Sequence, residues 1–94
     1  MATRIVSYGV ARSTADLGRM VRLHRKQRNL TLETLAGLSN VGIRFLSEFE
    51  RGKDTAEIGK VLQVMRSMGL EMVIMPRGQV QLLGLAQQTE DRHS

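Results

Sequence analysis

The chain has 94 residues, no cysteine and a formal net charge of +5. This length suits one domain, near the lower limit for folding on its own core, so support from oligomerisation would be unsurprising. The lack of cysteine excludes a disulfide framework and a thiolate metal site, and no apolar stretch is long enough for an export signal or a membrane span. The composition therefore predicts a soluble cytoplasmic protein.

The excess positive charge lies at the N-terminal end. Residues 1–30 hold seven basic side chains and one acidic one, whereas residues 31–60 and 61–94 carry net charges of −1 and 0. A basic end is expected of a protein that faces a polyanion, although an ordinary solvated helix face explains the same bias. The three aromatic residues are not interleaved with this charge, which argues against a single-strand binder.

Residues 1–13 lack a helical period and are predicted to form an N-terminal arm. Its Arg4 can reach a neighbouring minor groove, although a frayed terminus explains the pattern as well. Ser13, followed three residues later by Asp16, is typical of an N-cap and predicts a helix from about Thr14. The residues expected on the inner face of this helix are Leu17, Met20, Val21 and His24.

The next stretch predicts two short helices joined by a tight turn. Asn29 suits the left-handed end of the preceding helix, and Thr31 suits the N-cap of the next one. Asn40 suits a left-handed turn between the two short helices, and Gly42 and Gly52 would open and close the second. This is the arrangement of a helix-turn-helix whose second helix enters a DNA major groove.

The second short helix has two distinct faces. Stepping 100° per residue from Ile43 gathers a mixed polar face within an arc of about 140°. That face comprises Ile43, Arg44, Ser47, Glu48 and Arg51. The apolar residues on the opposite side are Phe45, Leu46 and Phe49. We therefore expect the apolar face to pack inward and the mixed face to meet an external partner.

A further helix is predicted before residue 69. Thr55 is the candidate N-cap of this helix and Gly69 its candidate stop. The apolar residues that recur at three- and four-residue intervals are Ile58, Val61, Leu62, Met65 and Met68. Such a stripe indicates a core-facing or interface-facing side.

From Leu70 the pattern changes to that of a β-strand, and residues 76–78 fit a hairpin turn that leads into residues 79–83. A lone strand or hairpin leaves an unpaired edge and exposed apolar side chains. We therefore expect it to pair with the same element of a second subunit in a two-fold dimer. The residues predicted at this interface are Leu70, Met72, Val73, Ile74 and Met75.

The predicted fold class is mainly α, with four to five helices and a C-terminal β-strand or hairpin used for dimerisation. It comprises one folded unit with flanking segments. The predicted division is an arm at 1–13, a helix-turn-helix DNA-binding domain at 14–69, a dimerisation element at 70–83 and a flexible tail at 84–94.

The run LTLETLAGLSNVGIRFLSEFERG, preceded by VRLHRKQRN and followed by TAEIGKVLQVMRSMGL, resembles the Cro/C1-repressor type helix-turn-helix of the XRE family. The resemblance covers residues 14–70 and implies a lambda-repressor-like domain. A layout that ends in a strand, with the segment VLQVMRSMGLEMVIM, is similar to HipB-like antitoxins. It implies a homodimeric repressor that binds its own palindromic operator in double-stranded DNA, with a HipA-like kinase toxin as partner.

The resemblance also implies roles for individual residues. Arg25 and Glu50 correspond to a structural ion pair. The base-reading positions correspond to Ile43, Arg44, Ser47 and Glu48. The phosphate-binding positions correspond to Thr31, Arg51 and Lys53. Leu32 stands where the family usually carries a glutamine that touches a phosphate, so one polar contact is missing here.

Chemistry narrows the base-reading roles. Arg44 suits a guanine, because a guanidinium can bond O6 and N7 together, and Ile43 can contact a thymine methyl group. Glu48 has two alternatives: it accepts from a cytosine N4 amine, or it pairs with Arg44 or Arg51 and does not touch DNA.

Catalysis finds no support in the sequence. His24 and His93 have no carboxylate or cysteine partner at a recognisable spacing, and neither a phosphate-cradling glycine run nor a metal-ligand spacing is present. We therefore predict no enzymatic activity, no cofactor and no metal, and a packing role for His24. Two alternatives stay open: a stand-alone or phage-type regulator without a toxin, and a protein-interaction module that keeps the fold but has lost base reading.

Overall fold

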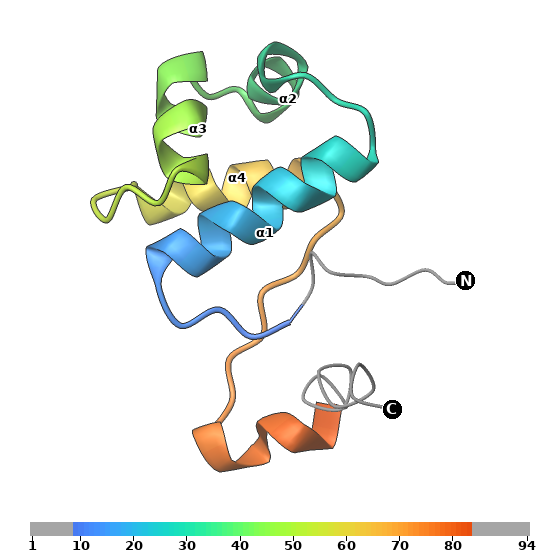
Figure 1. The fold of residues 1–94 in the computed structure, drawn as a ribbon, viewed down its shortest axis with the longest axis vertical. Helices are drawn as coiled ribbons and strands as arrows, with labels where there is room; N and C mark the ends of the chain where they lie inside the picture. Colours follow the sequence, from blue (N-terminus) through green and yellow to red (C-terminus); the bar gives the residue numbers. More distant parts are fainter. Residues whose placement is uncertain (1–8, 84–94) are drawn as a thin grey trace.

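The computed structural model describes residues 9–83, so the predicted arm residue Arg4 and the predicted tail at 84–94 lie outside the described residues. Helix α2 packs against α3 and α4, and α1 packs against α3. Figure 1 shows α2 and α3 together on one side of α1 and α4. The elements in chain order are α1 (Thr14–Gln27), α2 (Leu32–Ser39), α3 (Ile43–Glu50), α4 (Ile58–Ser67) and the 3-10 helix η1 (Arg77–Leu83).

Local signals set the ends of the first two helices. Ser13 caps α1 and Thr31 caps α2, each by accepting a 3.0 Å hydrogen bond from the backbone N–H three residues on. Asn29 and Asn40 adopt left-handed φ values of 59° and 58°. These starts and turns are as predicted, because each depends on side chains within one helical turn.

Helix α4 begins later than predicted. Thr55 does not cap it, because the helix starts at Ile58 with Glu57 at the N-cap position and no capping bond from its side chain. The buried stripe also differs from the predicted one: Val64 is buried, whereas Ile58 and Leu62 are exposed. Two overlapping apolar stripes share this helix, so the period alone did not decide which of them faces the core.

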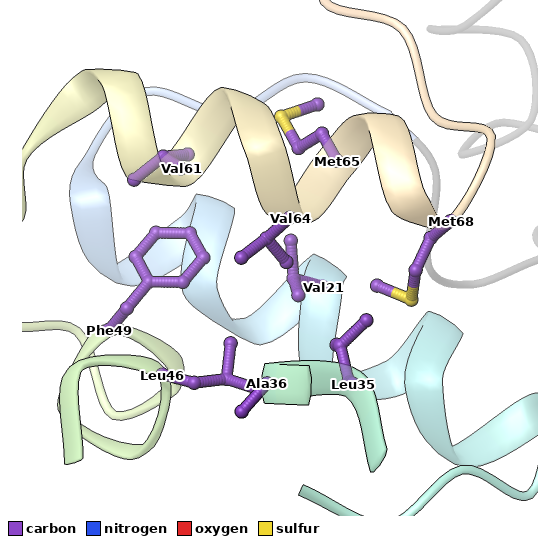
Figure 2. Close-up of a cluster of buried hydrophobic side chains, with 9 residues drawn as sticks. All are labelled: Val21, Leu35, Ala36, Leu46, Phe49, Val61, Val64, Met65 and Met68. Carbon is purple, nitrogen blue, oxygen red and sulfur yellow. The ribbon is translucent and has the colours of Figure 1, made fainter. Parts of the chain in front are cut away.

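The core fills the space between the four helices (Figure 2). Its nine buried apolar residues are Val21, Leu35, Ala36, Leu46, Phe49, Val61, Val64, Met65 and Met68. Phe49 is the largest of these side chains and points toward Val61 in Figure 2. Helix α1 supplies only Val21 to this set, so other contacts must fix α1 against its neighbours.

One of those contacts is the close approach of α1 to α3 at Gly18. A Cβ atom at this position would overlap the carbonyl oxygen of Phe49 and lie 3.2 Å from the Cα atom of Glu50. No side chain larger than hydrogen fits here unless the two helices separate. The sequence did not single out Gly18, because its importance arises from a partner 31 positions later in the chain.

The segment after Gly69 is not a strand. Within the described range, residues 70–76 have no regular structure and residues 77–83 form η1, so the predicted hairpin is not present in the single chain. Gly78 also lacks the left-handed φ that the predicted turn required. A strand needs partner backbone groups for its hydrogen bonds, and the four helices offer none. Figure 1 shows η1 below the four helices.

None of the helices within the described range is both long and apolar enough to cross a lipid bilayer. The longest, α1, has 14 residues and carries charged side chains along its exposed side.

Substitution Gly18→Ala is expected to destabilise the fold by about 1–3 kcal/mol, because the added methyl group overpacks the contact between α1 and α3. The measurement is urea unfolding followed by circular dichroism. Gly37→Ala is the matched control: a Cβ at Gly37 meets nothing within 4 Å. The control is expected to stabilise the protein by about 0.4–1 kcal/mol. Equal effects of the two substitutions would contradict the proposed close contact.

Candidate nucleic-acid interface

Helix α3 has one buried and one open face. Leu46 and Phe49 are fully buried against the core, and the Phe45 ring stacks on that of Phe49 at a centroid distance of 6.2 Å. On the opposite side, the Arg44 side chain is 91% exposed. The residues of the open face are Ile43, Arg44, Ser47 and Glu48, with the first two more exposed than the others. The two-faced helix is as predicted.

A group of charges surrounds the C-terminal end of α3. Arg51 is the C-cap of the helix, and Gly52, with a φ of 95°, turns the chain so that the Lys53 N–H donates to the Glu48 carbonyl oxygen at 3.0 Å. Glu48, Arg51, Gly52 and Lys53 line a shallow hollow of about 260 Å³. The structure therefore places both predicted phosphate-binding cations next to the open face of α3.

Glu48 bonds both to Arg44 on the open face and to Lys53 past the end of α3. Its Oε2 atom accepts a hydrogen bond from Arg44 Nε at 3.3 Å, and its Oε1 atom accepts one from Lys53 Nζ at 2.9 Å. The hydrogen bond from Lys53, followed by that from Arg44, lowers the pKa of Glu48 below its ordinary value. The carboxylate therefore stays ionised to lower pH than that of a free glutamate.

Thr31 is exposed at the start of α2. Its hydroxyl group accepts from the backbone N–H of Thr34 at 3.0 Å and donates to the hydroxyl oxygen of Thr34 at 2.9 Å. The hydrogen bonds of the side chain are therefore directed into the first turn of α2. The backbone N–H groups at this helix start carry the partial positive charge that favours an anion.

The structure brings Arg25 and Glu50 together as a buried pair between α1 and α3. Arg25 Nε lies 2.8 Å from Glu50 Oε2, and Arg25 Nη2 lies 2.9 Å from Glu50 Oε1, which makes the contact bidentate. The side chains are only 11% and 4% exposed. Arg25 Nη1 also donates to the Leu30 carbonyl oxygen at 2.8 Å. The hydrogen bonds with Glu50 raise the pKa of Arg25.

Two supporting contacts were not predicted from the sequence. Gln63 Nε2 donates to the Ser39 carbonyl oxygen at 3.0 Å, which ties α4 to the end of α2. Lys60 Nζ lies 5.4 Å from the centre of the Phe45 ring, which ties α4 to α3. Both contacts join residues from different helices, so no local sequence signal could have revealed them.

His24 is a packing residue, as predicted. It is buried, and its Nε2 atom lies 3.2 Å from the Met68 carbonyl oxygen at the end of α4. Within residues 9–83, no group of three histidine or acidic side chains is placed to hold a metal ion.

The predicted dimer residues differ in their surroundings. Leu70 packs partly against the core, whereas Ile74 is 93% exposed. Met72 and Val73 are also exposed, and Met75 is partly buried. Residues 72–74 therefore form a run of exposed apolar side chains, of which Ile74 is the most exposed.

The comparisons with known proteins bear on this arrangement. The chain matches no protein-family profile. It is 46% identical over 68 residues to an uncharacterised HTH-type transcriptional regulator, y4mF, of Sinorhizobium fredii, an alignment that spans 72% of this chain and 90% of that protein.

Solved structures show the same fold. A structure described as a HipB–O4 20mer complex superposes with a TM-score of 0.69 at 21% identity and covers 74% of this chain and 99% of that one. A structure of a HipA–HipB–O2–O3 complex gives the same values. At this level of identity the likeness concerns the fold alone.

Substitution Glu50→Ala is expected to destabilise the protein by about 3–5 kcal/mol, because it leaves the Arg25 guanidinium buried without its counter-ion. The measurement is equilibrium urea unfolding. The double substitution Arg25→Ala with Glu50→Ala should cost less than the sum of the single ones. Glu57→Ala is the control: it breaks an exposed pair with Lys60 of 2.9 Å. A control effect as large as that of Glu50→Ala would contradict the assignment.

Proposed function

Since this chain belongs to the HTH-type transcriptional regulators, we propose that it is a repressor that reads double-stranded DNA with the open face of α3. The observation that carries the proposal is the position of Arg44, whose side chain is 91% exposed on a helix that the core holds by its opposite face. The family membership and the HipB-like fold agree with the XRE-type resemblance in the sequence. A regulator of this class is not an enzyme.

The proposed base contacts lie in the first two turns of α3. Arg44 bonds O6 and N7 of a guanine, and the Ile43 side chain contacts a thymine methyl group. Ser47 lies one turn after Ile43 on the same face and can bond a base edge or a phosphate. Glu48 borders this set.

The proposed phosphate contacts flank the base-reading set. Arg51 and Lys53 lie just past α3, and Thr31 with the first N–H groups of α2 lies at the start of the preceding helix. Contacts on both sides would fix α3 in one register on the duplex. Residues 14–69 would thus form the DNA-binding domain, which acts in the cytoplasm on the nucleoid.

We propose that the chain works as a two-fold dimer on a palindromic operator. Its support is the exposed apolar run at residues 72–74 together with the strand-like pattern of the segment, which lacks a partner within the described chain. Pairing of this segment with its copy would bury the side chains and supply the missing backbone hydrogen bonds. The two α3 helices would then read half-sites about one helical turn, roughly 34 Å, apart.

A narrower role as an autoregulating antitoxin is part of the proposal. Its support is the fold shared with HipB, including HipB bound in a HipA–HipB–O2–O3 complex. The corresponding partner of this chain would be a HipA-like kinase toxin. A regulator without a toxin is the alternative. Copurification with the product of the neighbouring gene distinguishes the two.

The function is tested by binding to the DNA upstream of its own gene over a salt series. We expect a preference for one site over random duplex and a steep loss of affinity as salt rises, because phosphate contacts release condensed counter-ions. Fluorescence anisotropy with labelled duplexes from 50 mM to 200 mM salt gives both quantities. Flat, sequence-independent binding would favour an interaction module that has lost base reading.

In the same assay, Arg44→Ala is expected to weaken binding to the preferred site by about 1–3 kcal/mol and to relax the preference at one position of each half-site. The fold should persist, because the side chain is 91% exposed. Arg66→Ala, an equal loss of charge at an exposed position on α4, is the matched control. Unchanged preferred sequences in Arg44→Ala would remove Arg44 from the base-reading set.

Dimerisation is tested by Ile74→Asp. We expect the wild-type chain to sediment as a dimer and the variant as a monomer, because the substitution places a charge in the proposed apolar interface. Ile58→Asp is the matched control, since Ile58 is also exposed but lies in the first turn of α4, where an acidic side chain is tolerated. A dimeric Ile74→Asp variant would place the interface elsewhere.

A further inference from the structure

Glu48 forms ion pairs with cations on both sides of it. Its two carboxylate oxygens are used separately, one by Arg44 at 3.3 Å and the other by Lys53 at 2.9 Å. These two cations belong to different proposed contact sets, one for bases and one for phosphates. A single carboxylate therefore holds a member of each set.

Backbone hydrogen bonds hold the residues that follow α3 against Glu48. Its carbonyl oxygen accepts from the N–H groups of Arg51 and Lys53 at 3.2 and 3.0 Å, so the chain past α3 is folded back against it. Its side chain is 28% exposed, whereas those of Arg44 and Lys53 are 91% and 53% exposed. The acid is thus the fixed member of the group, and the two cations are the members that can swing away.

We propose that Glu48 is an internal counter-ion that occupies Arg44 and Lys53 in the free protein and that DNA must displace, so that it weakens DNA binding without reading a base. The inference rests on the proposed function, because it assigns a role within the same interface. A carboxylate and a phosphate present the same kind of charged acceptor to Lys53, so its DNA contact exchanges one anion for another. The DNA contact of Arg44 exchanges the carboxylate for O6 and N7 of a guanine.

The exchange has a defined thermodynamic consequence. Exposed ion pairs are worth little individually, so their loss costs little, but the released carboxylate stays beside the phosphate that replaced it and repels it. A glutamate carboxylate is ionised at neutral pH, so that repulsion is in force there. Because the pairs exist in the free protein, they reduce the affinity for preferred and random DNA by a similar factor.

The experiment compares Glu48→Gln with wild type on the preferred duplex and on a random duplex, over the same salt series. We expect Glu48→Gln to bind both about 3- to 10-fold more tightly, a factor set by the loss of two exposed ion pairs. The salt slope should become steeper by about one, because one more cationic charge is available to the phosphates. The base preference should not change.

Two further variants make the comparison specific. Glu57→Gln removes the same charge and an exposed lysine pair of the same 2.9 Å length on α4, outside the helix-turn-helix, and should change the affinity less than 2-fold. In a Lys53→Met background, the increase in DNA affinity caused by Glu48→Gln should be less than half of the increase in the wild-type background. One of the two cations that the substitution would release is then absent.

Three results would overturn the inference. If Glu48→Gln and Glu57→Gln change the DNA affinity equally while the wild-type chain binds DNA normally, the counter-ion role of Glu48 is wrong. The proposed function is then unaffected. Weaker binding of Glu48→Gln to the preferred duplex, with an altered preference at one base pair, would instead make Glu48 a base reader. If the wild-type chain binds neither duplex, the proposed function fails and this inference fails with it.

Discussion

The bidentate pair between Arg25 and Glu50 is the contact on which the orientation of α3 depends. It joins the last turn of α1 to the last residue of α3 through two hydrogen bonds of 2.8 and 2.9 Å. The same guanidinium also holds the Leu30 carbonyl oxygen, which precedes α2. Three elements of the domain therefore meet at one planar group whose donors have a fixed geometry.

This pair matters more for geometry than for net stability. A buried ion pair gains little over an apolar replacement of similar shape, because both charges lose their hydration. However, α1 contributes only Val21 to the buried apolar cluster, and it approaches α3 through Gly18, which has no side chain to interlock. The directional hydrogen bonds of Arg25 thus supply the specificity that apolar packing does not supply between these helices.

Local determinants explain what the sequence predicted correctly. The caps at Ser13 and Thr31, the left-handed Asn29 and Asn40, and the two faces of α3 each follow from residues within one or two helical turns. The predicted members of the site were brought together for the same reason, since Glu48 lies one turn after Arg44. The features that the sequence did not predict correctly depend on contacts between residues far apart in the chain.

The start of α4 shows where local rules stop. Thr55 has the residue type of an N-cap, but the helix begins at Ile58. Packing of α4 against α2, which no local pattern reveals, selects between the two overlapping apolar stripes. The segment at residues 70–76 is a stronger case. Its apolar run is typical of a strand that is buried on both faces, yet a strand exists only with a partner, and the described part of one chain supplies none. The Ile74 side chain stays exposed to solvent in the single chain.

Two glutamates at the end of α3 differ in burial and in how their carboxylates are paired. Glu50 is 4% exposed and shares both oxygens with one arginine, so exchanging its partner for a phosphate would leave a buried charge unpaired. Glu48, two residues earlier, is 28% exposed and divides its oxygens between two cations that reach into solvent. Its partners can leave because water can replace them. The ion pair of Glu50 is therefore fixed, whereas those of Glu48 on the other face of the helix can exchange. The packing of Leu46 and Phe49 in the core sets the orientation of the helix and thus which glutamate is buried.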